Sequence, residues 1–385
     1  MKHTSRILSI YSSDTAGVAS MLYELGGMTV IHDASGCNST YTTHDEPRWY
    51  QMDSMVYISA LTENDMILGN DEKLVKDVCR TAKELSPAFI ALCASPMPAM
   101  TGTDLKAVGE EIREKTLLPV FSICTNGMDC YLKGASEALL AYVKHFCRED
   151  AQKTGDLSVN ILGATPLDFS VNGTVEAVRK FLMEEGFRVV SCMCMGSSPG
   201  EIASAGAARV NLVVSSCGLA AAEYFRKKFG TPFVAGVPLG IGYAKRLARE
   251  LKKAAETGET LYSCLQRNVP GEGEKAPVIL HENVFASSLA CALEEDLHTR
   301  ARVIAPKVLT PFLRKEEDPI AECEDTLAEL FTKAGTIFAD PFYRAIAPGN
   351  VPFVSLPHEA FSGRCFRREN KVLAARKIPD WRKKC

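Results

Sequence analysis

Short runs of β-branched and other apolar residues alternate, along the whole chain, with longer stretches in which apolar residues recur every three or four positions. The short runs predict strands, and the longer periodic stretches predict amphipathic helices. Strands that alternate with helices are typical of parallel sheets, because a parallel connection has to cross back over the sheet. The pattern therefore predicts an α/β fold.

In the first part of the chain the pattern predicts four strands, at Arg6–Tyr11, Met28–His32, Ala88–Leu92 and Pro119–Ile123. Between the last two lies the segment TGTDLKAVGEEIREKT. Thr103 or Asp104 can cap a helix there, since both residue types accept hydrogen bonds from the first turn. This region is expected to be a parallel sheet flanked by helices.

Two polar stretches, Glu149–Leu157 and Asn268–Pro277, separate the chain into three parts. The later parts carry further candidate strands, in SVNILGA, FRVVSCMC, RVNLVVSS, TPFVAGVP, PVILHEN, RARVIAP, GTIFADP and VPFVSLPH. We expect three Rossmann-like domains, each a mostly parallel sheet flanked by helices, at residues 1–150, 151–270 and 271–385. The basic tail of the last domain is predicted to form a surface helix and extension.

Composition narrows the class of protein. The chain has 385 residues, 46% of them hydrophobic and 24% charged, with a net charge of −3. These values predict a globular protein that does not bind nucleic acid or an anionic membrane through a basic field. No stretch reaches the length of a membrane span, and the N-terminus does not resemble a signal peptide. We therefore expect a cytoplasmic protein.

Fourteen cysteines are then notable, because disulfides are rare in a reducing compartment. Most are expected to be small buried side chains. Three of them, Cys37, Cys93 and Cys124, each follow a predicted strand of the first domain. The carboxyl ends of parallel strands meet at one edge, where ligands usually bind. The three thiols could hold an iron–sulfur cluster, could simply be core residues, or could include a nucleophile, although no histidine is obviously paired with them.

The second domain offers weaker candidates. Cys192 and Cys194 alternate along a predicted strand and would share one face, and packing is the favoured interpretation. Cys217 follows the next strand. Gly196 and Ser197 lie in GSSPGE, a glycine-rich turn before a helical stretch, which could hold an anion at the helix N-terminus.

The third domain and the loop around Cys37 offer proton carriers. His358 lies in a Pro-His-Glu context, and Glu359 could orient it or accept its proton. His281 after PVIL is expected to be structural. The candidate proton donors near Cys37, which could equally form a solvated loop, are Tyr41, His44, Asp45 and Glu46.

Several segments, in order, resemble those of the nitrogenase component 1 type oxidoreductases, a superfamily that includes nitrogenase MoFe-protein subunits, a cofactor-assembly scaffold and tetrapyrrole reductases. HDASGCNSTY resembles the loop of the first bridging-cluster cysteine, here Cys37. LTENDMILGN resembles an acidic E-x-D-x-V-F-G-G segment, and ALCASPMPAMTGTDL resembles a T-C-x-x-x-x-x-G-D-D strand, loop and helix, with Cys93 as its cysteine. NLVVSSCGLAAAEYFRKKFGTPF and LPHEAFSGR resemble later segments that in the catalytic MoFe subunit hold a metallocluster, here near Cys217 and at His358.

The resemblance implies a three-domain nitrogenase component 1 architecture. DSMVYISA lacks the cysteine that nitrogenase subunits carry there, which favours a 4Fe-4S cluster at a subunit interface over an eight-iron cluster. Cys37 and Cys93 of each of two subunits would be its ligands, with Cys124 as a possible extra one. The implied partners are a second copy or a paralogous subunit, and an ATP-dependent iron–sulfur reductase. The resemblance implies that the cluster relays electrons from this reductase to a substrate in the cleft between domains. A second metallocluster or a tetrapyrrole could bind in the cleft between domains.

Two other interpretations stay open. The chain could be a non-catalytic scaffold that carries a metallocluster for another enzyme, or a thiol-rich binding protein without metal.

Overall fold

A computed structural model describes residues 6–34, 46–271, 273–306, 309 and 313–384. In the described part of the chain it contains three four-stranded sheets and one two-stranded sheet, all of them parallel. The predicted α/β fold with parallel sheets flanked by helices is confirmed. One four-stranded sheet falls in each of the predicted domains, while the domain boundaries themselves stay a prediction.

The first sheet has the order β2-β1-β3-β4. Its strands are β1 (Met28–His32), β2 (Met55–Ile58), β3 (Ile90–Ala94) and β4 (Val120–Ser122). Its helices are α1 (Asp14–Leu22), α2 (Glu63–Leu68), α3 (Asp71–Leu85), α4 (Pro96–Thr101), α5 (Leu105–Thr116) and α6 (Tyr131–Phe146). Alternate residues of β3 face opposite sides: Ile90 and Leu92 pack with α3 and α5, and Ala91 and Cys93 with α1 and α6.

Local signals explain several of these elements. The side chain of Asp104 accepts hydrogen bonds from the backbone N–H groups of Lys106 and Ala107, so the predicted cap of α5 is confirmed. The close crossing of α1 and α6 depends on two glycines. A Cβ at Gly17 would lie 2.0 Å from the Tyr131 carbonyl oxygen, and one at Gly134 would lie 1.9 Å from that of Asp14.

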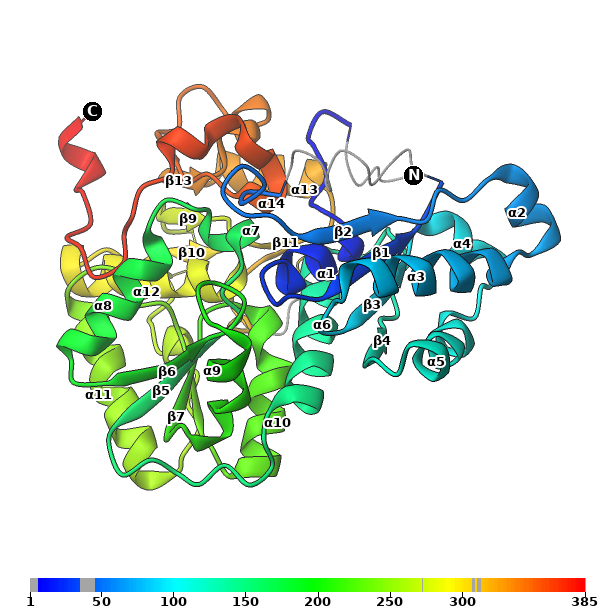
Figure 1. The fold of residues 1–385 in the computed structure, drawn as a ribbon. Helices are drawn as coiled ribbons and strands as arrows, with labels where there is room; N and C mark the ends of the chain where they lie inside the picture. The colour runs from blue at the N-terminus through cyan, green and yellow to red at the C-terminus, as the bar shows by residue number, and fades with distance from the viewer. Residues whose placement is uncertain (1–5, 35–45, 272, 307–308, 310–312, 385) are drawn as a thin grey trace.

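The prediction of a strand at Arg6–Tyr11 is wrong. Among the described residues this segment pairs with no strand, and the N–H groups of Arg6, Ile7 and Leu8 instead donate to the carboxylate of Glu324. The edge position of the sheet is taken by β2, from the DSMVYISA run, which the pattern did not single out as a strand. The N-terminal segment thus runs across to the third domain (Figure 1).

The second sheet has the order β6-β5-β7-β8. Its strands are β5 (Ser158–Leu162), β6 (Arg188–Cys192), β7 (Val210–Val213) and β8 (Phe233–Ala235). The helices around it are α7 (Pro166–Phe169), α8 (Thr174–Glu184), α9 (Pro199–Ala203), α10 (Leu219–Phe229) and α11 (Gly242–Thr257), with short 3₁₀ turns η2 (Ala205–Ala207), η3 (Ser216–Gly218) and η4 (Ser263–Leu265).

The third sheet has the order β10-β9-β13-β14. Its strands are β9 (Pro277–Ile279), β10 (Arg302–Val303), β13 (Thr336–Ala339) and β14 (Phe353–Ser355), and β11 (Ala305–Pro306) pairs separately with β12 (Ile320–Ala321). The remaining elements are α12 (Asn283–Leu297), α13 (Glu324–Thr332), η6 (Pro341–Ala345), α14 (Glu359–Ser362), η7 (Gly363–Glu369) and η8 (Trp381–Lys384).

The three sheets lie around a common centre, with α6 between the first sheet and the second domain (Figure 1). The largest cluster of buried apolar side chains runs continuously from the first domain through the second into the third. The starts of α6, α7, α12 and α14 meet at this centre. The residues at this centre therefore pack against side chains from all three domains.

Candidate functional site

The first candidate region is the carboxyl edge of the first sheet, where the predicted ligand cysteines were placed. Cys93 does not follow the strand as expected but lies within it, one residue before its carboxyl end. It is the fourth residue of β3, its side chain is fully buried, and its thiol donates to the carbonyl oxygen of Val30 at 3.7 Å. Burial, with a smaller effect of the Asp14 carboxylate, raises the pKa of the Cys93 thiol far above its usual value. A neutral, enclosed thiol is poorly suited to bind iron.

The register of the motif agrees with this placement. The T-C-x-x-x-x-x-G-D-D pattern has its cysteine six residues before its glycine. Six residues before Gly102 is Pro96, at the start of α4, and Cys93 lies three positions earlier. Cys93 as a cluster ligand stays a prediction, and both its burial and its register weigh against it.

Cys124, by contrast, lies beyond the end of β4 and is exposed. The loop that follows it rests on α4, because a Cβ at Gly127 would come 2.3 Å from the Pro96 ring. Exposed apolar side chains are found on both of these segments: Met97 and Met100 on α4 are 46% and 83% exposed, and Met128, after Cys124 in the loop, is 74% exposed. Cys37, Tyr41, His44 and Asp45 lie outside the described residues, and the described Glu46 is buried and paired with Arg48 at 2.6 Å.

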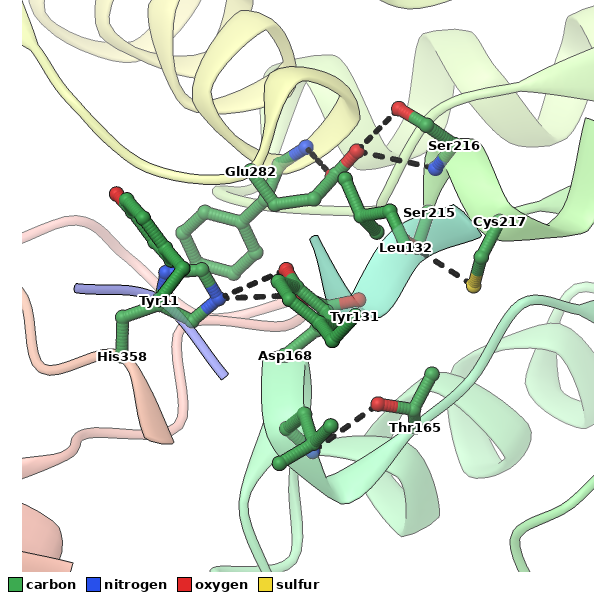
Figure 2. Close-up of polar contacts among 12 residues, drawn as sticks. Tyr11, Tyr131, Leu132, Thr165, Asp168, Ser215, Ser216, Cys217, Glu282 and His358 are labelled. Atoms are coloured by element: carbon green, nitrogen blue, oxygen red, sulfur yellow. Dashed lines mark hydrogen bonds and ion pairs between the residues drawn. The ribbon is translucent and has the colours of Figure 1, made fainter. Parts of the chain in front are cut away.

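The second candidate region is the junction of the three domains, shown in Figure 2. His358 from the start of α14 is 1% exposed, and its Nε2 lies 3.1 Å from Oδ1 of Asp168 on α7. The same nitrogen lies 3.2 Å from the hydroxyl of Tyr131, at the start of α6, and that hydroxyl donates to Asp168. Each of the three residues comes from a different domain, so the contact holds the domains together.

Burial sets the charge of this cluster. It lowers the pKa of His358 to about 3, so the imidazole is neutral. Burial also raises the pKa of Asp168, against the hydrogen bonds from Tyr131 and Ser215 that favour its charged form. Because the imidazole is neutral, an ionised Asp168 would be a buried negative charge with no positive charge from His358 to balance it. The protonated form of Asp168 is therefore the more stable one in this cluster.

A second buried acid, Glu282, lies nearby. One carboxylate oxygen accepts from the N–H and hydroxyl of Ser216 at 3.0 and 2.5 Å, and the other caps α12 by accepting from Val284 and Phe285. Burial, and then the neighbouring Asp168, raise the pKa of Glu282. Burial therefore favours the protonated forms of both Asp168 and Glu282.

Aromatic rings close the junction on the other side. The ring of His281 stacks on His358 with centroids 4.1 Å apart, and Tyr11 from the N-terminal segment meets His358 edge-on at 5.6 Å. His281 also packs on Phe285 at 4.4 Å. The space around the His358 imidazole is filled by side chains of the chain itself.

Cys217, the other predicted ligand of a second cofactor, lies in η3 and is buried. Its thiol donates to the carbonyl oxygen of Gly163 and to Ser215, each at 3.5 Å. In Figure 2 the Tyr131 side chain separates Cys217 from His358. Within the described ranges no three His, Cys, Asp or Glu side chains are arranged to hold a metal ion. A metallocluster or tetrapyrrole held by Cys217 and His358 stays a prediction, and the burial of both side chains weighs against it.

Glu359 does not orient His358 as expected. Its carboxylate accepts from Ser170 at 2.6 Å and pairs with Arg367 at 2.6 and 2.9 Å. The partner of the imidazole is Asp168, from the second domain. Glu359 is thus a link between α7 and η7.

The glycine-rich turn has internal partners too. The N–H of Gly196 donates to the Glu24 carboxylate, the Ser197 hydroxyl accepts from the N–H of Cys192, and Ser198 with Glu201 caps α9. An external anion would have to displace the chain's own carboxylates. The expected shared face of Cys192 and Cys194 is also wrong, because β6 ends at Cys192 and Cys194 has a φ of +72°.

Sequence reasoning found His358 and missed Asp168, Tyr131 and Glu282. A signal for two of them was present. Asp168 and Glu282 each follow a strand of a parallel sheet, β5 and β9, as the cysteines of the first domain do. The strand-end rule applied to carboxylates would have singled them out.

Comparison with known proteins places the chain in a family. Residues 14–275 match the family described as nitrogenase component 1 type oxidoreductase. The chain belongs to this family, as its sequence motifs indicated. No helix in the described part of the chain is long and apolar enough to cross a membrane.

Curated relatives differ in role. Over 207 residues the chain is 26% identical to a light-independent protochlorophyllide reductase subunit of Nostoc punctiforme, covering 51% of this chain and 41% of that protein. Over 201 residues it is 30% identical to the nitrogenase iron-molybdenum cofactor biosynthesis protein NifE of Sinorhizobium fredii, covering 51% of this chain and 39% of that protein. The aligned part thus spans about two fifths of each relative.

Solved structures extend the likeness to the whole fold. The structure of nitrogenase Cp1 at pH 6.5 superposes with a TM-score of 0.65 and 15% sequence identity, covering 93% of this chain and 87% of that chain. At this identity the likeness concerns the fold. The third sheet, which lies mostly beyond the family match, therefore belongs to the same architecture.

Proposed function

We propose that this chain is a subunit of a nitrogenase-like oxidoreductase that transfers electrons through an iron–sulfur cluster at the carboxyl edge of its first sheet. The family match and the likeness to a protochlorophyllide reductase subunit support a redox role. The proposed setting is the reducing cytoplasm, where thiols stay available for iron.

The observation that carries the proposal is the exposed Cys124 beyond the end of β4, followed in the chain by the exposed Met128. The exposed Met97 and Met100 lie on α4, which follows the neighbouring strand β3. An exposed thiol and exposed apolar groups at one edge of a sheet suit a surface that a second subunit covers. The partner would be a second copy or a paralogous chain.

The proposed ligands are Cys37 and Cys124 of each of two subunits. An exposed thiol at a strand end can become a thiolate and bind iron, whereas burial disfavours the thiolate of Cys93. A 4Fe-4S cluster bound there would accept and pass on single electrons, delivered by an ATP-dependent iron–sulfur reductase. The chain itself would supply the ligands, the apolar surroundings that exclude water, and the contact with the second subunit.

Anaerobic purification with iron and sulfide analysis tests this proposal. A shared four-iron cluster predicts about two iron atoms per chain and an EPR signal after reduction with dithionite. Cys37→Ala and Cys124→Ala should each lose most of the iron and the signal. Cys365→Ala, which removes another exposed thiol on η7, is the matched control and should keep both. An iron-free wild-type protein would leave only the metal-free binding protein.

A cofactor-assembly role is the second candidate, favoured by the likeness to a cofactor biosynthesis protein. The filled junction weighs against it, because a carried metallocluster would need another place. Reduced protein that turns over no substrate but passes iron and sulfide to a cofactor-free acceptor would support the assembly role over the redox role.

A further inference from the structure

A cavity of about 370 Å³ lies in the third domain, where Pro357 in its lining directly precedes the junction residue His358. One wall is β14, the edge strand of its sheet, and α12 supplies another through Leu289. The chain after η7 supplies the third, with Ile378 and Trp381 turned inward. The volume lies in the range of small-molecule sites.

The walls are apolar and firmly held. Phe338 and Trp381 meet edge to face with ring centroids 4.8 Å apart, and the indole N–H donates to the hydroxyl of Thr336 at 3.2 Å. The C-terminal wall is anchored on the second domain, since the N–H of Ala375 donates to Pro238 at 2.7 Å. A ligand would therefore meet a preformed apolar surface, which lowers the entropic cost of binding.

The residues that line the cavity include a charged side chain, Lys371. Lys371 is the single charged residue among the described residues that line the cavity. The acids near it along the chain are engaged with other groups: Glu369 accepts from Ser355 at 3.0 Å, and Asp380 pairs with Arg382 at 2.7 Å. The ammonium group of Lys371 is thus placed to meet an anion.

We infer that this cavity binds a small apolar molecule with one carboxylate or similar anionic group. Its body lies against Phe338 and Trp381, and its anionic group lies at Lys371. The aromatic walls select flat or chain-like apolar bodies, and the lysine selects acids over their neutral analogues. The site is separate from the proposed cluster edge, so it can be tested without iron.

Two fluorescent probes of the same skeleton test this inference on the full chain. Anilinonaphthalene sulfonate carries one negative charge, and N-phenyl-1-naphthylamine carries none. Both should bind saturably at one site per chain, with energy transfer from Trp381 that is lost in Trp381→Phe. Lys371→Gln should weaken the sulfonate about fivefold and leave the neutral probe unchanged, since an exposed ion pair contributes up to about 1 kcal/mol.

Lys377→Gln, on the same segment but outside the cavity, is the matched control and should bind both probes as the wild type does. Val354→Trp should fill the cavity and abolish binding of both probes, with folding checked by circular dichroism. Binding that survives Val354→Trp, or that Lys371→Gln and Lys377→Gln weaken equally, would overturn the inference.

Discussion

The carboxyl edge of the first sheet and the three-domain junction differ in what surrounds their reactive side chains. At the edge, Cys124 is exposed, and so are Met97, Met100 and Met128 on the segments that follow β3 and β4. At the junction, His358, Asp168 and Tyr131 are enclosed and bonded to one another. At the edge, the thiol of Cys124 is open to solvent, whereas the side chains of the junction form hydrogen bonds that link the three domains. The difference suggests chemistry at the edge and stability at the junction.

The strongest test of the junction concerns the helix crossing that positions it. Gly134→Ala should destabilise the protein by about 3 kcal/mol or more, since the new methyl group would overlap the Asp14 carbonyl and push α6, with Tyr131, away. Thermal or urea unfolding measures the change. Gly155→Ala, where a Cβ would meet nothing within 4 Å, should differ from the wild type by less than about 0.5 kcal/mol. Equal stability of the two variants would show that the crossing is not close.

Removing the acid of the junction should have the next largest effect. Asp168→Ala leaves His358 and Tyr131 without their buried partner, so we expect a loss of about 2–4 kcal/mol in the free energy of unfolding. Cys124→Ala at the edge should change it by less than about 0.5 kcal/mol. Equal losses in the free energy of unfolding of the two variants would contradict the proposed difference between the junction and the edge.

The stability of the protein should also depend on pH through the junction. The raised pKa values of Asp168 and Glu282 mean that the folded protein holds protons that the unfolded chain releases above about pH 4. Their stabilisation is fully present below that pH and is lost as the pH rises through the folded pKa values towards neutrality. The lowered pKa of His358 acts in the opposite sense, removing stability as the pH falls below about 6.5. Urea midpoints in Asp168→Asn should fall less between pH 6.5 and 8 than in the wild type; an unchanged pH slope would contradict this.

The smallest expected effect concerns Cys93. Cys93→Ala removes one buried sulfur, which should cost about 1 kcal/mol and leave the iron content of anaerobically purified protein unchanged. Loss of iron in this variant, with the fold intact, would return Cys93 to the set of ligands and show that the edge opens when a cluster binds.

The sequence predictions were correct where a feature depends on residues close together in the chain, and wrong where it depends on residues far apart. The limits of β1 and the cap of α5 were predicted because they depend on apolar runs and on contacts within a few residues. The Arg6–Tyr11 segment has the same apolar pattern, yet its N–H groups donate to Glu324 in the third domain. A local pattern indicates that a segment is buried or extended, but it does not identify the residues to which the segment's backbone forms hydrogen bonds.

The sequence by itself determined the family, the α/β layers and the importance of His358. Its motifs also directed attention to the edge of the first sheet. Only the tertiary structure decided that Cys93 is enclosed, because helices cover both faces of β3 and the thiol lies on the face that packs against α1 and α6. Only it decided that His358 pairs with Asp168 and not with the adjacent Glu359, because these partners come from separate domains and meet only when the domains pack.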